Sequence, residues 1–138
     1  KEIAFVNAFA ANDPDSTRMI WERLALDRPQ PGMRRIVLAN CRSDRLQRSE
    51  QIATLVARML DADHVVLSGE GTAVVAFKAV QQGLDPARLS DLGGRSAEDV
   101  YERVLELSGS KATVIGIGNI VGLGQEIVLH FHNRAERA

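Results

Sequence analysis

Residues 34–60, RRIVLANCRSDRLQRSEQIATLVARML, contain the structural unit on which the fold depends. The unit opens with a short, continuously apolar run from Arg35 to Ala39, as expected of a strand buried on both faces of a parallel sheet. Apolar residues then recur at the spacing of one helix face, at Ile52, Leu55, Val56, Met59 and Leu60. A buried strand followed by an amphipathic helix is the first half of a β-α-β unit and predicts an α/β fold.

The same unit recurs along the chain. The apolar runs are Ile3 to Val6, Arg35 to Ala39, His64 to Ser68, Ala112 to Ile117 and Ile127 to Phe131. Helical stripes lie between them: Met19, Ile20, Trp21 and Leu24; Ala73, Ala76, Phe77 and Val80; Ala97, Val100, Tyr101, Val104 and Leu105. Thr72 and Ser96 are predicted to cap the second and third of these helices. The last run alternates apolar and polar residues, which predicts an edge strand.

This order predicts a three-layer, Rossmann-like α/β domain. We expect a mostly parallel sheet of five to six strands, with helices on both faces and a C-terminal edge strand. Residues 88–92 are a candidate for the extra short strand. The length of 138 residues fits one domain spanning 1–138.

Composition excludes several classes of protein. Lys plus Arg number 17 and Asp plus Glu 18, so the net charge of −1 gives no basic footprint for nucleic acid. The single cysteine, Cys41, excludes an intrachain disulfide and a cysteine zinc cluster. No apolar run approaches the roughly 20 residues of a membrane helix.

Polar residues and glycines follow each predicted strand. Because ligands bind at the carboxyl ends of strands in open α/β sheets, these loops are the candidate site. The residues singled out are Asn7, Asn12 and Asp13; Arg42, Asp44 and Arg45; Gly69, Glu70 and Thr72; and Gly118 and Asn119. Arginine suits bidentate recognition of a carboxylate or phosphate, but a pair between Asp44 and an arginine that merely organises the loop is equally open. Likewise, Asn7, Asn12 and Asp13 are ordinary turn and cap residues.

Three other sequence patterns give weaker support for a functional site. Glycines at 116, 118, 122 and 124 resemble a dinucleotide loop, but Val121 breaks the GxGxxG motif, and no helix is predicted after it. We favour a glycine-rich turn. We interpret Cys41 as a buried, inert thiol rather than a nucleophile, since no histidine is near it in sequence. We interpret His130 and His132 as a solvated strand face rather than a metal site, and we expect no metal ligands in this chain.

Three loop motifs resemble one family. The stretch FVNAFAANDPDSTRMIWERL at 5–24 is similar to the opening of the C-terminal domain of the Mur ligase superfamily. NAFAANDP, NCRSDR and GIGNIVGLG resemble the C-terminal motifs of the poly-γ-glutamate synthase ligase subunit, the PgsB/CapB capsule biosynthesis family. The resemblance covers essentially the whole chain in the same order. Ala11 stands where Mur ligases have a histidine.

The resemblance implies an ATP-dependent amide ligase that polymerises glutamate into poly-γ-glutamate through an acyl phosphate. ATP and Mg would be bound mainly by a separate P-loop domain, which we expect upstream in the same polypeptide, because the sequence contains no P-loop motif. The chain is then expected to be inactive alone. Its implied partners are that upstream domain, glutamate, poly-γ-glutamate and membrane synthase subunits. Its implied location is the cytoplasm, at the inner face of the membrane.

The resemblance also implies roles for residues. Asn7, Asn12 and Asp13 match the turn that approaches the nucleotide. Gly69, Glu70 and Thr72 match the loop that meets the incoming amino acid, and Gly118 and Asn119 match a turn near the same pocket. Charge alone, since the product is a polyanion, assigns Arg42 and Arg45, with Asp44 beside them, to substrate carboxylates.

Two other functions remain open. The chain could be a stand-alone α/β module that binds a small anion or nucleotide. It could also be an assembly domain whose C-terminal edge strand pairs with another subunit, including a second copy in a homo-oligomer.

Overall fold

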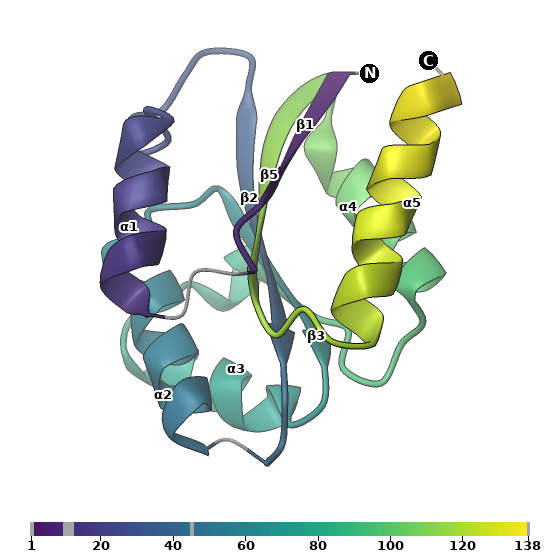
Figure 1. Cartoon of the computed structure of the whole chain (residues 1–138). Coiled ribbons are helices and arrows are strands. Elements are labelled where there is room, and N and C mark those ends of the chain that lie inside the picture. Colours follow the sequence, from purple (N-terminus) through teal and green to yellow (C-terminus); the bar gives the residue numbers. More distant parts are fainter. Residues whose placement is uncertain (1, 10–12, 45, 138) are drawn as a thin grey trace.

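The computed structural model describes residues 2–9, 13–44 and 46–137, with side chains described up to residue 133. Within these ranges one parallel sheet has the strand order β1-β5-β2-β3-β4 (Figure 1). The strands are β1 (Glu2–Asn7), β2 (Arg34–Cys41), β3 (His64–Gly69), β4 (Leu89–Asp91) and β5 (Lys111–Gly118). The predicted parallel α/β sheet is therefore confirmed, and β4 is the short extra strand expected at 88–92.

Helices cover both faces of the sheet, as Figure 1 shows. One layer contains α1 (Pro14–Arg23), α2 (Leu46–Thr54) with its π-helical continuation η1 (Leu55–Met59), and α3 (Thr72–Gln81). The other contains α4 (Ala97–Ser108) and α5 (Leu123–Arg137), while the 3₁₀ turn η2 (Pro86–Arg88) leads into β4. The chain crosses the sheet in one direction from β1 to β4 and returns from β4 to β5. Right-handed crossovers therefore place α4 on the opposite face from α1, α2 and α3.

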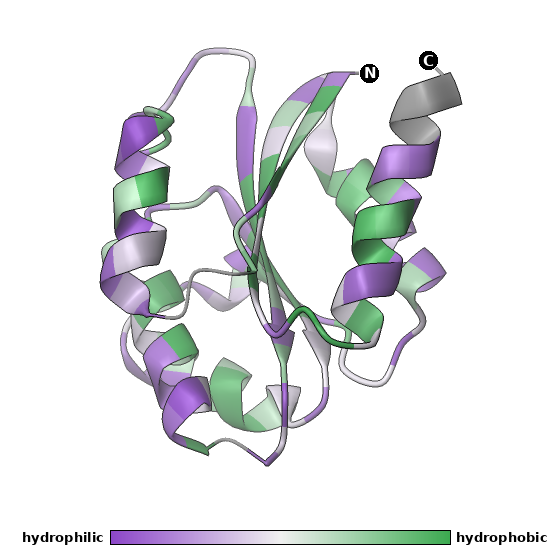
Figure 2. Ribbon diagram, viewed as in Figure 1, coloured by the Kyte–Doolittle hydropathy of each residue, from purple (hydrophilic) through white to green (hydrophobic). Residues whose placement is uncertain are grey.

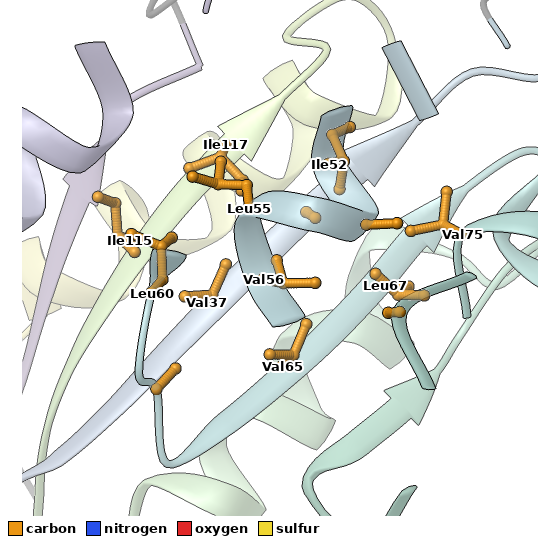
Figure 3. Close-up of a cluster of buried hydrophobic side chains, with 14 of the residues drawn as sticks. Val37, Ile52, Leu55, Val56, Leu60, Val65, Leu67, Val75, Ile115 and Ile117 are labelled. Atoms are coloured by element: carbon orange, nitrogen blue, oxygen red, sulfur yellow. The ribbon is translucent and has the colours of Figure 1, made fainter. Parts of the chain in front are cut away.

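Each face of the sheet has its own core. Because side chains alternate along a strand, Val37 and Ala39 of β2 face α1, α2 and α3, whereas Ile36 and Leu38 face α4 and α5. Figure 3 shows the first core, where side chains of α2, η1 and α3 meet those of β2, β3 and β5. Figure 2 shows the corresponding hydrophobic colouring of the strands at the centre of the molecule.

The prediction of a C-terminal edge strand is wrong. Residues 127–131 belong to α5, and a helix does follow the glycine-rich turn. Ile127 and Phe131 are buried one helical turn apart, and Phe131 stacks on Phe5 of β1 with ring centroids 4.3 Å apart. Leu129, which the alternating pattern placed on the same face, is 56% exposed. The apolar residues of this short segment fit the period of a strand as well as that of a helix, and the segment forms a helix that packs against α4 and β1.

Two details of α3 also differ from the sequence expectation. The residue at the N-cap position is Gly71, and Thr72 is the first helical residue. The buried face of the helix contains Thr72, Val75 and Ala79, while Phe77 is 68% exposed. Ser96, in contrast, caps α4 as predicted, since its Oγ accepts a hydrogen bond from the Asp99 amide at 3.1 Å.

None of the helices in the described part of the chain is both long and apolar enough to cross a bilayer.

Candidate functional site

The strand order creates a topological switch point at β5. β5 lies between β1 and β2, and the chain after β5 turns to α5 on one face. The chains after β1 and β2 turn to α1 and α2 on the other face (Figure 1). Loops that diverge in this way leave an opening at the carboxyl ends of the strands, which is where α/β sheets bind ligands.

A crevice of about 440 Å³ lies at this point, here called the strand-end crevice. Its lining residues are Phe9, Asn40, Arg42, Arg48, Ser49, Ile52, Gly118, Asn119, Ile120 and Val121. A slot of about 20 Å³ between α1 and α2 adjoins it and shares Arg48, Ile52 and Gly118. Because the slot has room for about one water molecule, the crevice is the better candidate for a ligand.

Arg42 forms a local ion pair beside the crevice. Its Nε and Nη2 donate to the two carboxylate oxygens of Asp44 at 3.0 and 2.8 Å. The structure thus contains the loop-organising pair that the sequence left open. Both side chains are well exposed, and such pairs contribute about 0–1 kcal/mol, so a ligand carboxylate could replace Asp44 at small cost. Arg45 lies outside the described residues, and the substrate role of all three remains a prediction.

Arg48 is a candidate that the sequence analysis missed. It lies in the first turns of α2, is half-buried, and lines both the crevice and the slot. A usable signal was present, because Arg48 stands four and seven residues before Ile52 and Leu55, in the register of the buried stripe. A cation in that register, directly after a strand, points toward the strand ends.

The turn after β5 forms one wall of the crevice. Its main chain is tied to β2, since the Asn119 amide donates to the carbonyl oxygen of Asn40 at 2.9 Å. Gly118 has a φ of +92°, and a Cβ there would overlap that same carbonyl oxygen. Glycine is therefore needed for both the backbone conformation and the close approach of β5 to β2. Gly118 and Asn119 line the crevice, and their contact with substrate stays a prediction.

Asp13 and Asn7 have local structural roles. Asp13 is the N-cap of α1, where its carboxylate accepts from the amide and the hydroxyl of Ser16 at 2.8 and 2.9 Å. These hydrogen bonds hold the pKa of the Asp13 carboxyl below its usual value. Asn7 Oδ1 accepts from the Phe9 amide at 3.3 Å. Asp13 lines the slot, Asn7 lines neither cavity, and Asn12 lies outside the described residues, so their nucleotide-side role stays a prediction.

Gly69, Glu70 and Thr72 lie at the same edge of the sheet but do not line the crevice. Glu70 is exposed and accepts from the Ser43 hydroxyl at 3.1 Å. Thr72 is buried against Gly93, where a Cβ would overlap the Thr72 hydroxyl. The structure therefore gives these residues loop-joining and packing contacts, and their predicted contact with the incoming amino acid is untested.

Cys41 and the histidines do not join the crevice. Burial, with a smaller contribution from Asp91, raises the pKa of the Cys41 thiol to about 12, as expected of an inert thiol. His130 stacks on Tyr101 with ring centroids 5.6 Å apart, and in α5 it is not on the same face as His132. No group of three His, Cys, Asp or Glu side chains among the described residues is arranged to hold a metal ion.

Fold and crevice together define a doubly wound α/β domain with a candidate ligand site at its switch point. Over residues 1–134 the chain belongs to the family described as the poly-gamma-glutamate synthase CapB C-terminal domain. It is 36% identical over 129 residues to PGA synthase CapB of Bacillus subtilis, and 35% identical over 128 residues to capsule biosynthesis protein CapB of Bacillus anthracis. Each match covers 93% of this chain but only 32% and 27% of the two relatives, so the chain spans about a third of their length.

A solved structure confirms the fold class. The chain superposes on a domain assigned to a UDP-N-acetylmuramate:L-alanyl-gamma-D-glutamyl-medo-diaminopimelate ligase of Haemophilus ducreyi with a TM-score of 0.58. The match covers 94% of this chain and 91% of the other at 15% identity, so it establishes the fold alone. The family expected from the loop motifs is thus confirmed, and the solved structure confirms the expected fold.

Proposed function

We propose that this chain is the substrate-side, C-terminal domain of an ATP-dependent amide ligase that polymerises glutamate into poly-γ-glutamate. The observation that carries the proposal is the strand-end crevice, whose lining includes the cationic Arg42 and Arg48 together with Asn40 and Asn119. Glutamate and its polymer are anions whose carboxylates need fixed cations and hydrogen-bond donors. The chain's membership of the poly-gamma-glutamate synthase CapB C-terminal domain family supports glutamate and its polymer as the anions.

The proposed reaction has two steps, phosphoryl transfer and amide formation. A carboxylate oxygen of the growing chain attacks the γ-phosphorus of ATP, which forms an acyl phosphate and releases ADP. The amino nitrogen of the incoming glutamate then attacks the acyl carbon, loses a proton and expels inorganic phosphate as the amide forms. Arg42 and Arg48 bind carboxylates that do not react and so orient the amine toward the acyl carbon. Gly69 and Glu70, at the same edge of the sheet but outside the crevice, meet the incoming glutamate in this proposal, while the buried Thr72 supports their loop.

ATP and Mg²⁺ belong mainly to another domain of the polypeptide in this proposal. One sequence observation supports it: the chain contains no P-loop motif. The domain closes over nucleotide bound elsewhere, with Asn7, Asn12 and Asp13 on the nucleotide side. The chain alone is then inactive, and its place at the inner face of the membrane depends on partner synthase subunits.

The test uses a full-length ligase that carries this domain. Arg48→Ala is expected to lower kcat/KM for glutamate by about tenfold or more, since a charged hydrogen bond to a carboxylate contributes roughly 1.5–3 kcal/mol. The matched control is Arg58→Ala, which removes the same charge from the exposed side of η1, outside the crevice. Radiolabelled glutamate incorporation and ADP release are measured together. Equal losses in both variants, or none in either, would contradict the proposal.

The two alternatives differ in their support. The assembly hypothesis depended on a C-terminal edge strand, and residues 127–131 form a helix instead. A stand-alone anion-binding module would use the same crevice without catalysis. Calorimetry separates it from the ligase proposal, because tight binding of ATP by this chain alone would place the main phosphate site here and overturn the division of labour described above.

A further inference from the structure

A buried amide joins three strand ends beneath the crevice. Asn40, near the end of β2, is 2% exposed. Its Nδ2 donates to the carbonyl oxygen of Asn119 at 2.7 Å, and its Oδ1 accepts from the hydroxyl of Ser68 at 3.0 Å. Ser68 belongs to β3 and Asn119 follows β5, so one side chain links the two strands that flank β2.

Glycines surround this amide closely. A Cβ at Gly69 would lie 2.8 Å from Asn40 Oδ1, and a Cβ at Gly124 would lie 3.3 Å from Nδ2. With Gly118 against the Asn40 backbone, the site accommodates the asparagine and little else. The side chain must also donate on one side and accept on the other, and the neutral amide does so with two separate atoms, Nδ2 and Oδ1.

We propose that Asn40 is a positioning residue of the strand-end crevice, whose side-chain amide fixes the Asn119–Val121 turn and thereby the geometry in which the crevice receives a carboxylate. Without this donor the half-buried Asn119 carbonyl would lose its side-chain partner, and the turn would open toward solvent. The choice of carboxylate as ligand rests on the proposed function, whereas the ordering of the turn does not.

Asn40→Asp is the sharpest variant because it keeps the shape and removes one donor. One carboxylate oxygen still accepts from Ser68, but the other faces the Asn119 carbonyl without a hydrogen. At pH 8 we expect the Asn119 amide to exchange about tenfold faster than in the wild type, relative to core amides of β2, as measured by NMR. Acidification to pH 5 should restore protection after correction for intrinsic exchange, because burial raises a carboxyl pKa and the protonated acid regains an O–H donor.

Ser108→Ala is the matched control. It removes another buried side-chain hydrogen bond, from Ser108 Oγ to the Val104 carbonyl, at the opposite end of the molecule. It should leave the exchange of Asn119 relative to the core unchanged at both pH values. If Asn40→Asp fails to fold, Ser68→Ala removes the donor to Oδ1 and should loosen the same turn severalfold.

The binding experiment uses γ-linked triglutamate as the ligand and the full 138-residue chain. In an NMR titration at pH 8, Asn40→Asp should raise the Kd for triglutamate at least fivefold over the wild-type value. At pH 5 the Kd of this variant should return to that of the wild type measured at the same pH. Ser108→Ala should bind triglutamate like the wild type at both pH values. Unchanged exchange at Asn119 in both turn variants would overturn the positioning role. Loosening of the turn in a chain whose wild type does not bind triglutamate would uphold the positioning role and count against the proposed function.

Discussion

The two ends of the sheet both carry arginines beside a hollow, yet they use them differently. At the amino ends of the strands, a cavity of about 520 Å³ lies beside Arg34, Asp63 and His64. At the carboxyl ends, the strand-end crevice of about 440 Å³ lies beside Arg42 and Arg48. Size and charge alone do not distinguish the two ends.

The difference lies in what the chain itself does with those charges. The Arg35 side chain is 3% exposed, and it donates to the carbonyl oxygen of Leu26 at 2.8 Å and to both carboxylate oxygens of Asp63. Arg34 donates to the Leu107 carbonyl at 2.7 Å. The pair of Arg42 and Asp44, in contrast, is local and exposed. The amino end uses arginine to hold loops together, whereas the carboxyl end keeps it at the surface of a crevice.

The largest effect is expected at the amino end. Arg35→Met leaves the Leu26 carbonyl without its side-chain donor and leaves Asp63 with only the backbone amide of residue 35. It should lower the free energy of unfolding by about 3 kcal/mol. Urea denaturation followed by circular dichroism measures the change. A loss below about 1 kcal/mol would mean that the buried guanidinium has no major structural role, and the contrast between the two ends would fail.

A glycine pair gives the next largest effect. Gly118→Ala combines a positive φ with overlap on the Asn40 carbonyl, and should cost about 2–3 kcal/mol of stability. Gly32 also has a positive φ, +77°, but nothing lies within 4 Å of the added Cβ, so Gly32→Ala should cost only about 1 kcal/mol. Thermal unfolding of both variants checks the order. Equal costs would show that β5 and β2 can separate at the crevice without penalty.

The pH dependence of stability should show a smaller effect at Asp63. Burial opposes ionisation of this carboxyl, but hydrogen bonds from the Arg35 side chain and backbone and the Arg35 charge together lower its pKa from 3.8. A lowered folded pKa gives stability that is present above the unfolded pKa and is lost as the pH falls through the folded value. Between pH 6 and pH 3, wild type should therefore lose more stability in urea titrations than Asp63→Asn. Parallel losses would rule out the ion pair as their source.

Most strands and helices could be predicted in their order along the chain, because the apolar residues of each element follow one clear period. The C-terminal segment could not, since Ile127 and Phe131 fit a strand face as well as two turns of a helix. Contacts distant in sequence resolve that ambiguity: Phe131 stacks on Phe5, 126 residues earlier, and packs edge-on against Tyr101 of α4. In α3, the sequence has apolar residues on nearly every side, so the pattern did not reveal that Val75 and Ala79 face the core.

The sequence predicts the edge of the sheet at which the candidate site lies, but not which residues line it. The carboxyl edge and the loops of Arg42 and Gly118 follow from the rule for parallel sheets. Which loops share one cavity depends on β5 inserting between β1 and β2, which no local pattern encodes. The family resemblance places Glu70 and Thr72 near the same pocket as Asn119, but the structure puts them outside its crevice and adds Asn40 and Arg48 to the lining.

The most direct test of the central claim is an NMR titration of the isotopically labelled chain with γ-linked triglutamate. The predicted result is a set of saturable chemical-shift changes at the amides of Arg42, Arg48 and Asn119 to Val121, with none at Gly32 or Lys111 at the amino end. Changes centred on the amino-end cavity, or no saturable change at the crevice, would contradict the assignment of the strand-end crevice as the carboxylate site.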